Sequence, residues 1–156
     1  MKILSKPVVD PNVCTNSVLR RAARNMGQLY DDMLSPSGLK GTQFTLLANI
    51  VALDEPTMRE LAEALVMDLS ALGHALKPLT RDGWVVLYAD ARDGRAKRVK
   101  LTVKGLAKFK EAMARWQEAH GRFESAYGAK KAAALRSALC LIASEDFNTL
   151  FLPNAK

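Results

Sequence analysis

Residues that build catalytic and metal sites are scarce in this chain. Its 156 residues include two cysteines and two histidines. The cysteines lack the paired spacing of a zinc site, and the sequence contains neither a glycine-rich phosphate loop nor a nucleophile elbow. The sequence therefore predicts a protein that is not an enzyme and that holds neither a metal nor a cofactor.

Long apolar runs are absent as well. No run approaches the roughly eighteen residues that a transmembrane helix requires, and Met1 to Leu4 is too short to be the apolar core of a signal peptide. These absences predict a single cytoplasmic unit without a membrane partner. In that compartment, Cys14 and Cys140 are expected to be reduced.

Positive charge is present in excess, and it is concentrated in one segment. The formal net charge is +7, and residues 90 to 110 hold eight basic residues against two acidic ones, an excess of six. Phosphates on either side of a duplex groove attract such a concentration of charge. The favoured partner is therefore double-stranded DNA.

Two short helices are predicted just before the basic segment. Thr57 and Glu60 have the spacing of a capping box, which begins a helix, and Asp68 favours the cap of a second one. Gly83 is the expected stop of the second helix. Two helices so close together are typical of a helix-turn-helix. The leucines of the second helix form its predicted buried stripe: Leu72, Leu76 and Leu79. Its predicted DNA contacts on the opposite face are Ser70, His74, Lys77 and Arg81.

A β-hairpin with a basic tip is predicted after the second helix. Trp84 to Tyr88 is rich in β-branched and aromatic residues, residues 98 to 103 alternate, and Asp93-Gly94 indicates a tight turn between them. Arg95 at the apex suits the negative potential of a narrow minor groove. For Asp93, a site role and ordinary turn chemistry both remain open. The predicted DNA contacts of the hairpin are Arg92, Asp93, Arg95, Lys97 and Arg98.

These segments resemble the MarR-type winged-helix transcriptional regulators. The resemblance is carried by Met58 to Leu65, by Leu76 to Gly83, and above all by Asp90 to Lys97 running into Val99 to Gly105. It implies a homodimer that binds a pseudo-palindromic operator, usually as a repressor, and that is released by a small molecule or by thiol oxidation. It also implies that Asp93 holds the wing and that Arg95 enters the minor groove.

The fold that this resemblance implies is mainly α with a small β-wing. A single protomer, residues 1–156, would contain a winged helix-turn-helix region at 42–105 between dimerisation helices at 12–34 and 106–150. A helix over 103–127 would be about 37 Å long, too long for one small winged-helix domain to cover. The alternative to the implied homodimer is a monomer. Its terminal helices, including one predicted at 130–144, would pack on the helix over 103–127.

An effector site is predicted through the same resemblance, since relatives place ligands, often aromatic acids, between the dimer helices and the winged domain. Arg20 and Arg24 are candidates to pair with a ligand carboxylate. The aromatic candidates beside them, each of which has a core role as its alternative, are Tyr30, Phe44, Trp116 and His120.

Other functions remain open from the sequence. Some relatives sense oxidants through a thiol in the first helix, which makes Cys14 a redox candidate, with packing as its alternative. The second predicted helix offers few groups that read bases, so a redox-gated or ligand-independent DNA binder and a protein-interaction module are both alternatives. The charged hairpin distinguishes them, because a protein-binding module has no need for four cations there.

Overall fold

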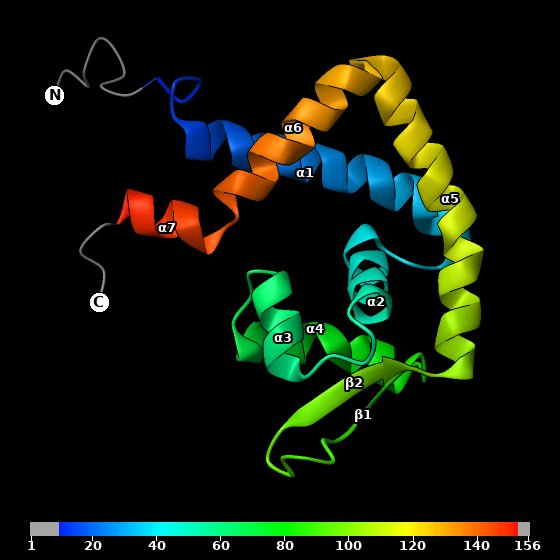
Figure 1. Ribbon diagram of the computed structural model, residues 1–156. Coiled ribbons are helices and arrows are strands. Elements are labelled where there is room, and N and C mark those ends of the chain that lie inside the picture. The colour runs from blue at the N-terminus through cyan, green and yellow to red at the C-terminus, as the bar shows by residue number, and fades with distance from the viewer. Residues whose placement is uncertain (1–9, 153–156) are drawn as a thin grey trace, which may run out of the picture.

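The structure, a computed structural model, describes residues 10–152. Figure 1 shows its helices and strands in chain order. They are α1 (Thr15–Leu34), the 3₁₀ turn η1 (Ser35–Ser37), α2 (Gly41–Ala52), α3 (Met58–Ala64), α4 (Leu69–Arg81), β1 (Val85–Ala89), β2 (Lys97–Leu101), α5 (Val103–Tyr127), α6 (Ala129–Ile142) and α7 (Glu145–Phe151). This mainly helical architecture with one small hairpin confirms the predicted fold class.

The long helix α5 connects the two parts of the molecule (Figure 1). It begins beside β2 and ends at the opposite side of the molecule, where α6 folds back. Helix α1 packs against α5, and α2 contacts both of them as well as α3, α4 and β2. Within the described residues, no helix is both long enough and apolar enough to cross a membrane.

Side-chain caps set the start of α3 and of α4. The Thr57 hydroxyl accepts a hydrogen bond from the Glu60 amide at 3.2 Å, and the Thr57 amide donates to the Glu60 carboxylate at 2.7 Å. Asp68 accepts from the Ala71 amide at 2.7 Å. Each cap satisfies an amide that the first helical turn leaves without a partner. Both predicted caps are confirmed.

Helix α4 packs its leucine stripe into the core as the spacing predicts. Leu72, Leu76 and Leu79 are buried. Pro78 lies inside the helix, which continues to Arg81. Gly83 follows with a φ of +73°, a left-handed conformation that glycine adopts without steric cost. The predicted stop is therefore confirmed.

We call β1, β2 and the loop between them, residues 85–101, the wing. The antiparallel strands pair Val85 with Leu101 and Ala89 with Lys97 at their two ends. The connection is a loop of residues 90–96, and within it the Ala96 amide donates to the Asp93 carbonyl at 2.9 Å, which closes the tight turn predicted at Asp93-Gly94. The Asp90 amide donates to the Ala96 carbonyl at 2.9 Å and closes this loop at its base.

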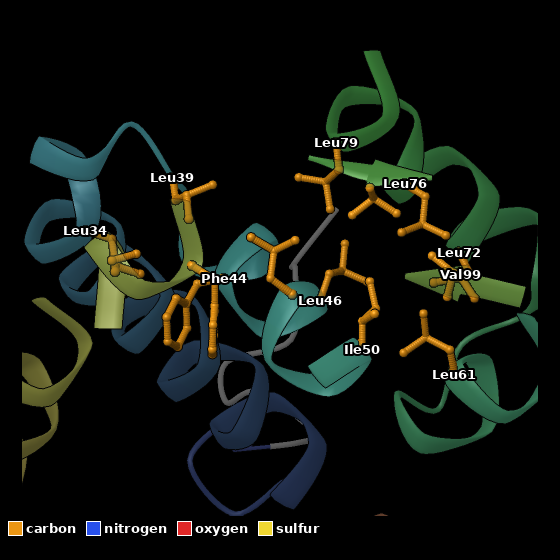
Figure 2. Close-up of a cluster of buried hydrophobic side chains, with 14 of the residues drawn as sticks. Leu34, Leu39, Phe44, Leu46, Ile50, Leu61, Leu72, Leu76, Leu79 and Val99 are labelled. Carbon is orange, nitrogen blue, oxygen red and sulfur yellow. The ribbon is translucent and has the colours of Figure 1, made fainter. Parts of the chain in front are cut away.

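Helix α2 lies at the centre of the core. Figure 2 shows Phe44, Leu46 and Ile50 of this helix between Leu34 and Leu39 on one side and residues of α3, α4 and β2 on the other. Burial of these side chains supplies most of the driving force for packing. The core thus fixes α4 relative to α1 and α5.

The start of α5 depends on a close approach between two backbone segments. The Thr102 hydroxyl caps the helix by accepting from the Gly105 amide at 3.0 Å. A Cβ on Gly105 would lie 1.8 Å from the carbonyl oxygen of Trp84, so only glycine fits. Val103, which the alternation of residues 98 to 103 places in the strand, instead begins α5 and is 90% exposed.

The terminal helices differ from the predicted ones in their bounds. Helix α1 begins at Thr15, whereas the sequence pattern predicts a start at residue 12. The helix predicted at 130–144 is α6, which ends at Ile142, and the sequence pattern misses α7. The hydroxyl of Ser144 caps α7 by accepting from the Phe147 amide at 3.2 Å, so this serine begins a new helix.

Candidate nucleic-acid interface and adjoining cavity

The outward face of α4 carries the side chains predicted to contact DNA. Ser70, His74, Lys77 and Arg81 are all exposed, and their spacing places them on one helical face. Lys77 Nζ lies 3.4 Å from His74 Nδ1. Arg81 pairs with the carboxylate of Asp82 at 2.9 Å, so one of the two cations on this face already has an anionic partner.

The wing tip presents exposed basic residues at the end of the hairpin. Arg92, Arg95 and Lys97 are exposed there. Asp93 is exposed too, and its carboxylate accepts a hydrogen bond from the Arg95 amide at 3.0 Å. This contact is local turn chemistry, and it orders the backbone next to Arg95.

Arg98 is set back from the tip. It is half-buried, its Nε donates to the carboxylate of Asp90, and its guanidinium donates to the main-chain carbonyl of Glu55 at 2.7 Å. The structure therefore does not bring Arg98 together with the exposed cations of the tip. Arg98 instead supports the wing through its contacts with Asp90 and Glu55.

Asp90 organises the base of the wing, and the sequence pattern did not single it out. Its carboxylate accepts from the amides of Arg92 at 2.7 Å and Asp93 at 3.1 Å, and from Arg98. The Arg92 amide, the Arg98 guanidinium and the Asp93 amide together lower the pKa of Asp90 from 3.8 to about 2. The sequence feature that could have identified Asp90 is its position, since it is an aspartate at the first residue of the loop in a basic hairpin.

The loop before α3, which contains Asp54 and Glu55, also contacts the strands of the wing. Tyr88 donates from its hydroxyl to the Glu55 carboxylate, which raises the pKa of Tyr88. Lys100 lies 3.8 Å from the other oxygen of that carboxylate. Asp54 and Glu55 both have positive φ, 53° and 57°, an uncommon conformation for residues other than glycine. These contacts couple the wing to the helix-turn-helix.

A cavity of about 680 Å³ opens beside the core, between α1, α2, α5 and the segment that leads into α4. Its lining residues are Met26, Gly27, Tyr30, Asp31, Leu34, Gly41, Thr42, Phe44, Thr45, Leu46, Leu65, Met67, Ala75 and Trp116. A mostly apolar lining with a few polar groups is typical of small-molecule sites.

Stacked aromatic rings form one side of this cavity. Phe44 stacks on Trp116 with ring centroids 5.9 Å apart, and on Phe109 at 5.3 Å. His120 stacks on the Trp116 ring at 5.1 Å but does not itself line the cavity. Burial raises the pKa of Tyr30, which lines the cavity as a neutral phenol.

The arginines predicted to hold a ligand lie elsewhere on α1. Arg20 and Arg24 are exposed, and neither lines the cavity. The structure thus brings together three of the four aromatic candidates, Tyr30, Phe44 and Trp116, without the two cations.

Both cysteines are free thiols. Cys14 is half-buried at the cap of α1, where its side chain makes no capping hydrogen bond, and Cys140 is exposed on α6. Across residues 10–152, no group of three or more His, Cys, Asp or Glu side chains is placed to hold a metal ion.

Comparison with known proteins gives a consistent family. A family model described as the MarR family matches residues 37–96. The multiple antibiotic resistance protein MarR of Salmonella typhimurium is 36% identical over 80 residues, which are 51% of this chain and 56% of that protein. The match to this curated relative therefore spans little more than half of its length.

Two solved structures match over most of the chain. The transcriptional regulator MosR of M. tuberculosis, in complex with DNA, is 37% identical with a TM-score of 0.69, covering 81% of this chain and 96% of that one. A mutant MarR from E. coli complexed with operator DNA is 26% identical with a TM-score of 0.76, covering 86% and 96%.

Proposed function

Because this chain belongs to the MarR family, we propose that it is a dimeric DNA-binding transcriptional regulator. It represses by occupying a pseudo-palindromic operator, and a small molecule bound in the cavity releases it. Helix α4 enters the major groove, and the wing tip reaches the adjacent minor groove.

The observation that carries this proposal is that different residues of the wing form its exposed tip and its anchored base. Arg92, Arg95 and Lys97 are exposed at the tip, whereas Arg98 and Asp90 hold the base of the wing against the loop before α3. A hairpin that is charged at its tip and anchored at its base suits insertion into a narrow groove. The resemblance to MosR, whose structure includes DNA, supports this reading.

A homodimer is supported by the apolar side chains that the terminal helices leave uncovered. The most exposed of them are Val13, Leu141, Leu150, Phe151 and Leu152. Four of these five lie between residues 141 and 152, and a soluble monomer rarely exposes such a concentration of large apolar residues. Pairing these surfaces between two protomers would bury them and would set two α4 helices about 34 Å apart, one turn of the duplex.

The position of the cavity supports control by a ligand. Ala75 of α4 lines it, as do Leu65 and Met67 from the turn that leads into α4, while Tyr30 belongs to α1 and Trp116 to α5. A molecule bound there would contact both the recognition helix and the helices assigned to the dimer. It would shift the spacing of the two recognition helices if it bound one spacing more tightly than another.

Fluorescence anisotropy of a labelled DNA fragment from the region upstream of the gene tests this function. We expect the affinity to fall linearly on a log–log plot between about 50 and 200 mM salt, with a slope of about −0.9 for each neutralised phosphate. Binding should also exceed that of a scrambled fragment. A flat salt profile would instead favour a protein-interaction module, and equal binding of both fragments would favour a DNA binder without sequence preference.

A further inference from the structure

The lining of the cavity carries one formal charge, and this charge is negative. Among the fourteen lining residues, only Asp31 carries a formal charge at neutral pH, and there is no lysine, arginine or histidine. A carboxylate ligand would therefore meet an anion and no cation. An aromatic acid is the wrong electrostatic match for these groups.

Asp31 is fixed in place but has spare capacity for a ligand. Its Oδ1 accepts from the Gly41 amide at 2.6 Å, at the first residue of α2. Within residues 10–152, no cationic side chain pairs with it. An ionised carboxylate accepts several hydrogen bonds, so its second oxygen remains available to a donor.

A second lining side chain also offers an acceptor. Thr45 donates its only hydroxyl hydrogen to the carbonyl of Gly41 at 2.9 Å. What it can present to the cavity is therefore the lone pairs of that oxygen. Asp31 and Thr45 both act on Gly41 at the first turn of α2, so the two acceptors belong to one region of the lining.

The remaining wall suits a flat apolar body. Phe44 and Trp116 stack with an interplanar angle of 18° and line the cavity together, beside Met26 and Leu46. The faces of both rings are occupied by stacking, so the ring edges and the neighbouring aliphatic groups that line the cavity provide van der Waals contact.

We propose that the cavity binds an aromatic amine in its protonated, cationic form. The ammonium group donates to Asp31 and Thr45, and the ring system packs along Phe44 and Trp116. The assignment of ligand class uses only the residues of the cavity, while its regulatory meaning rests on the proposed function.

Three probes that share one ring system and differ in charge test the ligand class. They are 2-naphthylmethylamine, 2-naphthylmethanol and 2-naphthoate, titrated calorimetrically into the full chain at pH 7 without DNA. We expect the amine to bind at least about tenfold more tightly than the alcohol, as charge-assisted hydrogen bonds allow. The carboxylate should bind most weakly.

A charge-removing pair of variants locates the effect. Asp31→Asn keeps an oxygen for the Gly41 amide and loses the negative charge, so the preference for the amine over the alcohol should largely disappear. Glu63→Gln makes the same charge change on the exposed face of α3, away from the cavity lining, and should keep the preference.

Several outcomes overturn the proposal. Tightest binding by the carboxylate would do so, and it would favour the expectation for Arg20 and Arg24. Equal binding of the three probes, or no binding of any probe at millimolar concentration, would also overturn it. A preference that survives in Asp31→Asn would also overturn it. DNA affinity measured separately on the same preparation distinguishes this failure from failure of the regulator function, since either property can be lost while the other is observed.

Discussion

The guanidinium of Arg98 lies against the carboxylate of Asp90 at the base of the wing, and it donates at the same time to the main-chain carbonyl of Glu55 at 2.7 Å. One side chain thus joins the loop of the hairpin to the loop that precedes α3. Beside it, the Val99 amide donates to the Pro56 carbonyl at 2.9 Å. The orientation of the wing relative to the helix-turn-helix is set by these contacts.

Replacement of Arg98 should loosen the wing without unfolding the core. In Arg98→Ala, the contacts to Asp90 and Glu55 are both lost, so we expect faster hydrogen exchange of the amides of residues 92–96 and several-fold weaker DNA binding. Arg98→Lys should rescue only in part, because one ammonium lacks the forked geometry of a guanidinium. Arg115→Ala, on the exposed face of α5, is the matched control. Unchanged exchange in Arg98→Ala would remove this contact from wing order.

Acid should destabilise the protein through Asp90. Because the pKa of Asp90 is lowered from 3.8 to about 2, its ionised form contributes stability that is complete above about pH 4 and is lost as the pH falls toward 2. The unfolded chain takes up the proton more readily in that window. The melting temperature should therefore fall more steeply between pH 6 and pH 2 for the wild type than for Asp90→Asn. Parallel curves would contradict this linkage.

Two glycines of α5 should respond oppositely to alanine. In Gly105→Ala, the new Cβ would lie 1.8 Å from the Trp84 carbonyl, and backbone must move, so we expect a loss of about 1 to 3 kcal/mol in the free energy of unfolding. At Gly121 nothing lies within 4 Å of the added Cβ. Gly121→Ala should then gain up to about 1 kcal/mol from helix propensity. Urea unfolding measures both, and equal effects would refute the close approach.

Arg95 at the wing tip should contribute directly to DNA binding. Arg95→Ala should weaken operator binding by about 1 to 3 kcal/mol if the guanidinium makes a desolvated groove contact. The salt dependence should become shallower at the same time. Arg122→Ala removes the same charge from α5, where that side chain pairs with Glu118 at 2.7 Å, and should bind as the wild type does. Wild-type affinity in Arg95→Ala would exclude the wing tip from the mechanism.

The exposed apolar ends should hold two protomers together. Sedimentation at micromolar concentration should show a dimer, and Leu141→Glu combined with Leu150→Glu should yield monomers, because each buries a charge in the proposed interface. Leu69→Glu is the control, since Leu69 is 52% exposed on α4, away from the terminal helices. A monomeric wild type would defeat this interface, and so would a double variant that remains dimeric.

Local chemistry explains why much of the fold could be predicted from the sequence. Thr57 and Glu60 cap a helix through groups three residues apart, and Gly83 ends one through its own φ preference. Such signals need no knowledge of the rest of the chain. The sequence pattern assigned Val103 both to the end of the hairpin and to the start of a helix over 103–127, and the structure has the helix.

The candidate site was predicted less completely, because its parts are joined across long sequence separations. The sequence places Arg95 at the apex and Arg98 in the strand, but no local signal indicates that Arg98 is held by Glu55, 43 residues away, while Arg95 is exposed. The cavity likewise combines Asp31 and Trp116, and no sequence pattern indicates that Arg20 and Arg24 lie outside it.

The sequence by itself determined the helix caps, the leucine stripe of α4, the basic hairpin and the family resemblance, since each depends on residues close together in the chain. Only the tertiary structure decided which cations are exposed and which support the wing, and which charges line the cavity. The physical reason is that a side chain's electrostatic role depends on the partners that folding brings near it. Those partners come from elements far apart in sequence.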